Sequence, residues 1–96
     1  MNSIKVYHFW KTTCPPCNAI KPSISELHDE FANMPWESVN VDTDKSGLAQ
    51  RFGVTSVPTM VTVAQDERGN IIHSERHSGT SISGYYRIVR NLLRFI

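Results

Sequence analysis

The first third of the chain consists of a short apolar run followed by a long amphipathic segment. Residues 4–10 are rich in β-branched and aromatic side chains, which predicts a strand that is buried on both faces. A helix is predicted to start near Pro15, because a proline fits the first helical positions, where no backbone donor is needed. Pro22 falls inside this helix and is expected to kink it. The apolar stripe of the helix consists of Ile20, Ile24, Leu27 and Phe31.

The remaining predicted elements are mostly shorter. A second strand is predicted over residues 36–41, and a short helix over residues 45–52, with Asp42 or Asp44 as its cap. Residues 57–63 and 71–76 are strand-like and flank a polar turn, which favours a hairpin. A last helix follows the glycine at position 79. Its apolar side is expected to comprise Ile82, Tyr85, Tyr86, Val89, Leu92, Leu93 and Ile96.

The predicted order of elements is β-α-β-α-β-β-α, which indicates one α/β domain over residues 1–96. The first crossover makes the first two strands parallel, and such crossovers are right-handed. The hairpin adds an antiparallel pair, so we expect a four-stranded mixed sheet with helices on both faces. Cys14 and Cys17 follow the first strand and therefore lie at its carboxyl end, where open α/β sheets usually carry their chemistry.

Composition and charge narrow the class of partner. Hydrophobic residues make up 40% of the chain and the formal net charge is +1, so charge gives no attraction for nucleic acid or for an acidic membrane surface. No apolar run approaches the roughly 18–20 residues that span a bilayer. The first ten residues lack the pattern of a secretory signal. A cytoplasmic location is therefore expected, with no nucleic acid or membrane partner, and the chain is expected to be a monomer.

The two cysteines of the chain are spaced C-x-x-C, which in a cytosolic protein indicates metal or redox chemistry. Cys14 is predicted to lie at the helix start, where unpaired N–H groups and the helix dipole favour an anion. The pKa of its thiol is therefore expected to fall below the ordinary value of about 8.5. Cys17 follows roughly one helical turn later. Cys14 is thus the predicted nucleophile of thiol–disulfide exchange, and Cys17 the thiol that resolves the mixed disulfide.

Zinc binding is the main alternative for this motif. His73 and His77 supply two further potential ligands, but they lie far away in sequence, on a predicted strand end. We therefore expect no metal site. A cysteine pair without a chemical role is a further alternative. Pro15 and Pro16 stiffen the segment between the cysteines, while Pro16 also removes a donor to the thiolate, so their net effect on the reduction potential is left open.

Several correctly spaced segments resemble the thioredoxin family. Phe9–Cys17 is similar to the thioredoxin segment F-W-A-x-W-C-G-P-C, and Phe52–Thr59 resembles Y-G-I-R-G-I-P-T. Pro22 falls at the helix-kinking proline of that family, and Val39–Asp42 is similar to its next strand. Gly79 matches a glycine that lines the family's substrate groove. The resemblance covers nearly the whole chain.

This resemblance implies the thioredoxin fold and disulfide exchange with proteins, without a cofactor. It also implies a cis peptide bond between Val57 and Pro58 beside the cysteines, where the backbone of Val57 is free to pair with a bound peptide. Pro58 is thereby assigned to the catalytic site. The residues expected to bind substrate are Thr13, Pro15, Pro16, Val57 and Gly79. A reductase similar to thioredoxin reductase is the implied electron donor.

The chain departs from the family pattern at three places. The first strand and helix of the family are expected to be absent, because the chain begins almost directly at the strand before the cysteines. Thr13 replaces a tryptophan. His8 stands where the family keeps a buried aspartate that assists proton transfer to the resolving cysteine, and Ser38 replaces the partnering lysine. Because histidine titrates near neutrality, His8 is a candidate proton acceptor for Cys17, the alternative being a packed neutral histidine.

The predicted function is therefore a protein-disulfide oxidoreductase acting through Cys14 and Cys17, and specifically a general cytoplasmic disulfide reductant. Its predicted partners are disulfide-containing proteins and the reductase. The alternatives are a disulfide oxidase or isomerase, a glutaredoxin-like protein coupled to glutathione, and a non-catalytic binding subunit with the thioredoxin fold. The reduction potential of the cysteine couple distinguishes these redox alternatives, because a value well below the glutathione poise favours a reductant and a value well above it favours an oxidant.

Overall fold

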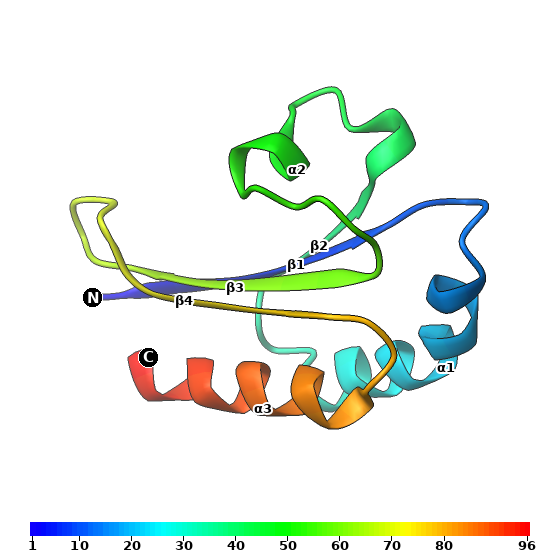
Figure 1. Cartoon of the computed structure of the whole chain (residues 1–96). Coiled ribbons are helices and arrows are strands. Elements are labelled where there is room, and N and C mark those ends of the chain that lie inside the picture. The colour runs from blue at the N-terminus through cyan, green and yellow to red at the C-terminus, as the bar shows by residue number, and fades with distance from the viewer.

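A four-stranded mixed sheet forms the centre of the computed structural model, which describes residues 1–96 (Figure 1). Its strand order is β2-β1-β3-β4. β1 (Ser3–Trp10) runs parallel to β2 (Trp36–Asn40) and antiparallel to β3 (Thr59–Gln65). β3 also pairs with the antiparallel strand β4 (Ile71–Ser78). The predicted four-stranded mixed sheet is confirmed.

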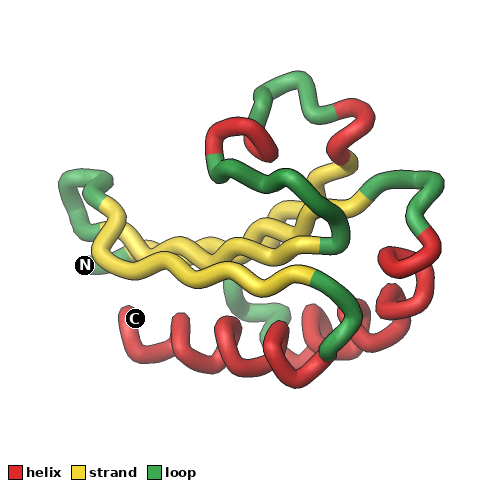
Figure 2. The backbone as a smooth tube through the Cα atoms, viewed as in Figure 1, coloured by secondary structure: helices red, strands yellow, loops and turns green.

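Helices cover both faces of this sheet, as predicted, but unequally. α1 (Pro15–Glu30) and α3 (Ile82–Leu92) lie on one face, and η2 (Leu93–Phe95) follows α3 (Figure 1). The short helices η1 (Val41–Thr43) and α2 (Leu48–Arg51) lie over the opposite face, joined by loops (Figure 2). None of these helices has the length and apolar character needed to cross a membrane.

The unequal cover divides the core into two clusters. The larger cluster lies between the sheet and the two long helices, and comprises Ile4, Val6, Ile20, Ile24, Leu27, Met34, Met60, Ala64, Tyr85, Ile88, Val89 and Leu92. The smaller cluster, on the side of α2, comprises Phe9, Val39, Leu48, Val61 and Val63. The expectation that β1 is buried on both faces is wrong, because α2 is too short to cover that face fully. Lys5 and Tyr7 are left half-buried there.

α2 is shorter than the helix predicted over residues 45–52. Gly47 directly precedes it with a left-handed backbone, φ 68°, which interrupts the predicted helix and lets α2 begin only at Leu48. The carboxylate of Asp44 accepts hydrogen bonds from the backbone N–H groups of Leu48 and Ala49, at 3.0 and 2.8 Å. Asp44 is therefore the capping aspartate. β3 begins at Thr59, two residues later than predicted, since Pro58 has no N–H to donate to the sheet.

The apolar side of α3 also differs from the prediction. Ile88 is buried but was not expected there, whereas Leu93 and Ile96 remain 41% and 75% exposed. The helix ends at Leu92, and the tighter turn of η2 follows it, in which Phe95 packs against the larger core cluster while Leu93 stays exposed. The buried positions are thus spaced as Tyr85, Ile88, Val89 and Leu92, which is the regular stripe of an α-helix.

Candidate active site

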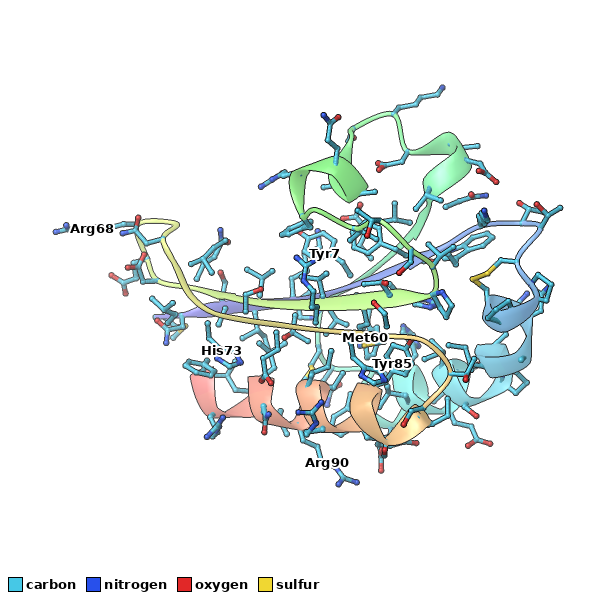
Figure 3. All side chains as sticks on the ribbon, in the orientation of Figure 1. Tyr7, Met60, Arg68, His73, Tyr85 and Arg90 are labelled. Carbon is cyan, nitrogen blue, oxygen red and sulfur yellow. A yellow bond between two sulfur atoms is a disulfide. The ribbon has the colours of Figure 1, made fainter.

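Cys14 and Cys17 form a disulfide at the start of α1, with their Cα atoms 5.2 Å apart (Figure 3). The loop that follows β1 brings the pair to the carboxyl end of a central strand, as predicted. Both cysteines are nearly buried, at 4% and 7% exposure. Thr13, Pro15 and Pro16 are exposed beside them. The disulfide therefore lies just beneath an uncharged surface.

Cys14 is the N-cap residue of α1, with an extended backbone. Its sulfur accepts a hydrogen bond from the backbone N–H of Cys17 at 3.2 Å. Pro15 and Pro16 occupy the first two helical positions and carry no N–H, so the N–H of Cys17 is the first donor that the helix offers. The predicted helix start is confirmed. The same donor is in place to stabilise a thiolate on Cys14 when the disulfide is reduced.

The segment before β3 packs against the disulfide from the other side. The Val57–Pro58 peptide bond is cis, as the resemblance implies. The carbonyl oxygen of Val57 lies 3.9 Å from Sγ of Cys14. Gly79, with φ 96°, donates its N–H to the carbonyl oxygen of Pro58 at 3.1 Å. The fold thus brings Val57, Pro58 and Gly79 together around Cys14, although 43 to 65 positions separate them from it in sequence.

A hollow of about 370 Å³ lies behind the disulfide, between α1, β1 and β2. Cys17 and His8 both line it, together with Trp10, Lys21 and Ser38. Ser38 is the partner of His8 in the register of β1 and β2. The structure therefore brings the candidate proton acceptor and the resolving cysteine to the same hollow.

The environment of His8 contradicts the expectation that this residue titrates near neutrality. Its Nε2 atom is buried and has no hydrogen-bond partner. Burial lowers the pKa of His8 from 6.5 to about 4, because the charged imidazolium loses its hydration there and no carboxylate compensates for that loss. His8 is therefore neutral at pH 7. A neutral imidazole can accept a proton, but the lowered pKa makes His8 a weaker base than an exposed histidine.

Two contacts near the site carried no signal in the sequence pattern. The indole Nε1 of Trp10 donates to Oγ of Ser38 at 2.7 Å, which links the end of β1 to the middle of β2. The hydroxyl of Tyr85 donates to the carbonyl oxygen of Gly79 at 2.6 Å. Tyr85 was predicted only as an apolar position of the last helix. A fully buried tyrosine usually needs a partner for its hydroxyl, but the sequence does not reveal which one.

The side chains considered for the zinc alternative do not gather into a metal site. No group of three or more His, Cys, Asp or Glu side chains is placed to hold a metal ion. His73 contacts the carboxylate of Glu75 at 2.9 Å, and His77 contacts the carbonyl oxygen of Ser81 at 2.8 Å. The two histidines weighed as potential zinc ligands are thus engaged with other groups, and the cysteine sulfurs are bonded to each other.

Comparison with known sequences matches this chain to one protein family. The family model described as Thioredoxin matches residues 1–83. A thioredoxin from Haemophilus influenzae is 41% identical over 56 residues, which are 57% of this chain and 51% of that protein. The chain spans only a third to a half of the length of the curated relatives matched first, at 33% to 51%.

Comparison with solved structures gives the same fold. Mitochondrial thioredoxin 3 from Saccharomyces cerevisiae has a TM-score of 0.76 at 23% identity, covering 96% of this chain and 81% of that one. A thioredoxin f2, solved in a complex with ferredoxin:thioredoxin reductase, has a TM-score of 0.72 at 19% identity, covering 93% and 76%. At these identities the likeness shows the fold alone, which is the thioredoxin fold.

Proposed function

Because the chain belongs to the thioredoxin family, we propose that it catalyses disulfide exchange with other proteins through Cys14 and Cys17. Its thioredoxin relatives and its C-x-x-C disulfide support a thiol–disulfide oxidoreductase. The observation that carries the proposal is the position of that disulfide. Its first sulfur accepts a helix N–H and lies 3.9 Å from the backbone carbonyl of Val57, the group with which a substrate strand is proposed to pair.

The exchange proceeds in two balanced steps. The Cys14 thiolate attacks one sulfur of a target disulfide, forming a mixed disulfide and releasing the other target sulfur as a thiolate, which takes up a proton. Cys17 then loses its proton and attacks the sulfur of Cys14. This second step closes the Cys14–Cys17 disulfide and releases the remaining target thiol. Two electrons pass from the protein to the target.

His8 is the proposed acceptor for the proton that leaves Cys17. Both residues line the hollow behind the disulfide, and the imidazole is neutral and has an unpartnered Nε2. A proton on His8 would be paired with the negative charge left on Cys17, which offsets part of the burial cost that lowers the pKa of this histidine. The proposed transfer is coupled to the attack of Cys17. The target thiolate that this attack expels takes up the proton from His8, so no lasting imidazolium remains.

The proposed direction is reduction of target proteins in the cytoplasm, followed by re-reduction of the Cys14–Cys17 disulfide by a reductase. The complex of thioredoxin f2 with ferredoxin:thioredoxin reductase supports a reductase as electron donor for a protein of this fold. A reducing compartment suits the proposal, since the cysteine pair must be in its reduced, dithiol form to reduce a target.

Reduction of insulin by the purified protein, with dithiothreitol as the electron source, tests the proposed activity. The unmodified protein should accelerate the reaction, and Cys14→Ser should abolish the acceleration. Cys17→Ser, reduced beforehand and mixed with insulin in the absence of dithiothreitol, should stop at a mixed disulfide that a gel without reductant detects. If the double variant Cys14→Ser/Cys17→Ser retains the biological activity of the protein, the chain is a binding subunit and the proposal is wrong.

A further inference from the structure

Tyr85 places a hydroxyl group beneath the segments that surround the disulfide. The side chain points from α3 toward the sheet and is fully buried (Figure 3). Its hydroxyl donates to the carbonyl oxygen of Gly79 at 2.6 Å and lies 3.3 Å from the carbonyl oxygen of Pro58. One phenol therefore contacts the backbone of two separate segments.

These two segments flank the β3–β4 hairpin in sequence and meet at its open end, where Thr59 pairs with Ser78. Pro58 immediately precedes β3, and Gly79 immediately follows β4. The N–H of Gly79 also donates to the carbonyl oxygen of Pro58, at 3.1 Å. The phenol, Pro58 and Gly79 thus form a closed set of three contacts, in which each group touches the other two. Losing the hydroxyl would leave the two segments joined by their backbone hydrogen bond and by the neighbouring contact of Thr59 with Ser78.

The ring of Tyr85 is itself held on its outer side. His77 packs edge-on against it with a centroid distance of 4.5 Å, and its Nε2 contacts the carbonyl oxygen of Ser81 at 2.8 Å. The ring of His77 occupies the space over Gly84, where an added Cβ would overlap it. The phenol therefore has little freedom to leave its partners. Burial also raises the pKa of Tyr85 to about 12, so its hydroxyl keeps its proton and remains a donor at physiological pH.

We propose that Tyr85 is a positioning residue for substrate docking, which acts by holding the backbone of Pro58 and Gly79 in register beside Cys14. This inference rests on the proposed function. Val57 directly precedes Pro58, and its carbonyl oxygen lies 3.9 Å from Sγ of Cys14, so a shift of Pro58 moves the backbone group with which a target strand would pair. The sulfur chemistry itself does not involve the phenol.

Tyr85→Phe tests this role, because it retains the buried ring and removes only the hydroxyl. With insulin as substrate, we expect KM to rise about three- to tenfold, the effect of losing one hydrogen bond, and kcat to change less than about twofold. The reduced protein should react with 5,5′-dithiobis(2-nitrobenzoate) at an unchanged rate, because this small disulfide can reach Cys14 without pairing with the backbone of Val57. Tyr86→Phe is the matched control, since that ring packs beside Arg90, outside the site, and should leave both reactions unchanged.

Gly84→Ala provides a second route to the same result. The added methyl displaces the ring of His77 and loosens its contact with Tyr85 without changing the phenol. KM for insulin should rise here too, and this variant carries the test if Tyr85→Phe fails to fold. The inference is overturned if KM stays within twofold of the unmodified protein in the folded variants, or if the reaction with the small disulfide slows in parallel. If the unmodified protein does not reduce insulin at all, the proposed function fails and this inference fails with it.

Discussion

The backbone N–H of Cys17 donates a hydrogen bond to the sulfur of Cys14 at 3.2 Å, so the resolving residue also supplies the first donor to the attacking sulfur. This relationship follows from the two intervening prolines, which occupy the first helical positions and have no N–H. The thiolate of Cys14 is therefore stabilised by one helix donor and by the helix dipole, with no help from positions 15 and 16.

Restoring an N–H at position 16 should lower the pKa of the Cys14 thiol. Pro16→Ala adds a donor in the first turn, and we expect a decrease of about 0.5–1 unit, because a hydrogen bond to the charged form favours it. The rate of alkylation of the reduced protein by iodoacetamide, measured against pH, reports this pKa. Pro22→Ala, in the middle of the same helix, is the control and should leave it unchanged. An equal or higher pKa in Pro16→Ala would mean that the helix N-terminus does not govern Cys14.

Removing the imidazole of His8 should slow the resolution of the mixed disulfide. In His8→Ala, the proton of Cys17 loses its proposed acceptor, and we expect resolution to slow about tenfold, below the usual range for a general base because the pKa of His8 is low. Stopped-flow measurement of target release across pH 5–9 follows this step. Ser38→Ala leaves the imidazole in place and should have less than about a twofold effect. An unchanged pH dependence in His8→Ala would remove His8 from the mechanism.

His8 should also make the fold less stable as the pH falls below neutrality. Its pKa is about 4 in the folded protein and about 6.5 when unfolded, so between these values the unfolded chain binds a proton that the folded chain does not. Above pH 6.5 both forms are neutral and the effect vanishes. From pH 7 to pH 5 we expect the unmodified protein to lose about 2 kcal/mol of unfolding free energy more than His8→Leu, at about 1.4 kcal/mol per pH unit below 6.5. Urea unfolding at the two pH values measures the difference, and parallel losses in both proteins would show that His8 titrates normally.

The register of α3 can be tested by comparing two adjacent leucines. Leu92 is fully buried, whereas Leu93 is 41% exposed. Leu92→Ala should lower the unfolding free energy by about 2–5 kcal/mol, because it leaves a cavity in the larger core cluster. Leu93→Ala should cost less than about 1 kcal/mol. Denaturant unfolding measures the loss of unfolding free energy in each variant. Equal losses would contradict the assignment of Leu92 as the last buried residue of α3.

Short-range patterns predicted the elements and the position of the cysteines. Pro15 marked the start of α1, and the spacing of Ile20, Ile24 and Leu27 identified its buried face, since both signals depend on neighbours within a few turns. The cis bond before Pro58 came from the family resemblance alone. Base rates favour a trans bond at any given proline, so the residues themselves did not predict it.

Features that depend on distant contacts were not predictable in this way. The pKa of His8 depends on how completely α1 and β2 remove water from its imidazole, which no local pattern reports. The partners of the Tyr85 hydroxyl lie 6 and 27 positions away, in segments that meet only after the sheet has formed. The left-handed conformation of Gly47, which shortened α2, is one that glycine permits but does not require.

Mass spectrometry after alkylation of the protein in graded redox buffers tests the Cys14–Cys17 couple most directly. We expect one transition between a doubly alkylated form and an unalkylated form that contains the intramolecular disulfide. Its midpoint should lie below the glutathione poise of the cytosol, about −220 to −260 mV by biochemical extraction, as a reductant requires. A midpoint well above that range would indicate an oxidant. If both thiols stay open to alkylation in every buffer, the cysteines are not a redox couple and the proposed function is wrong.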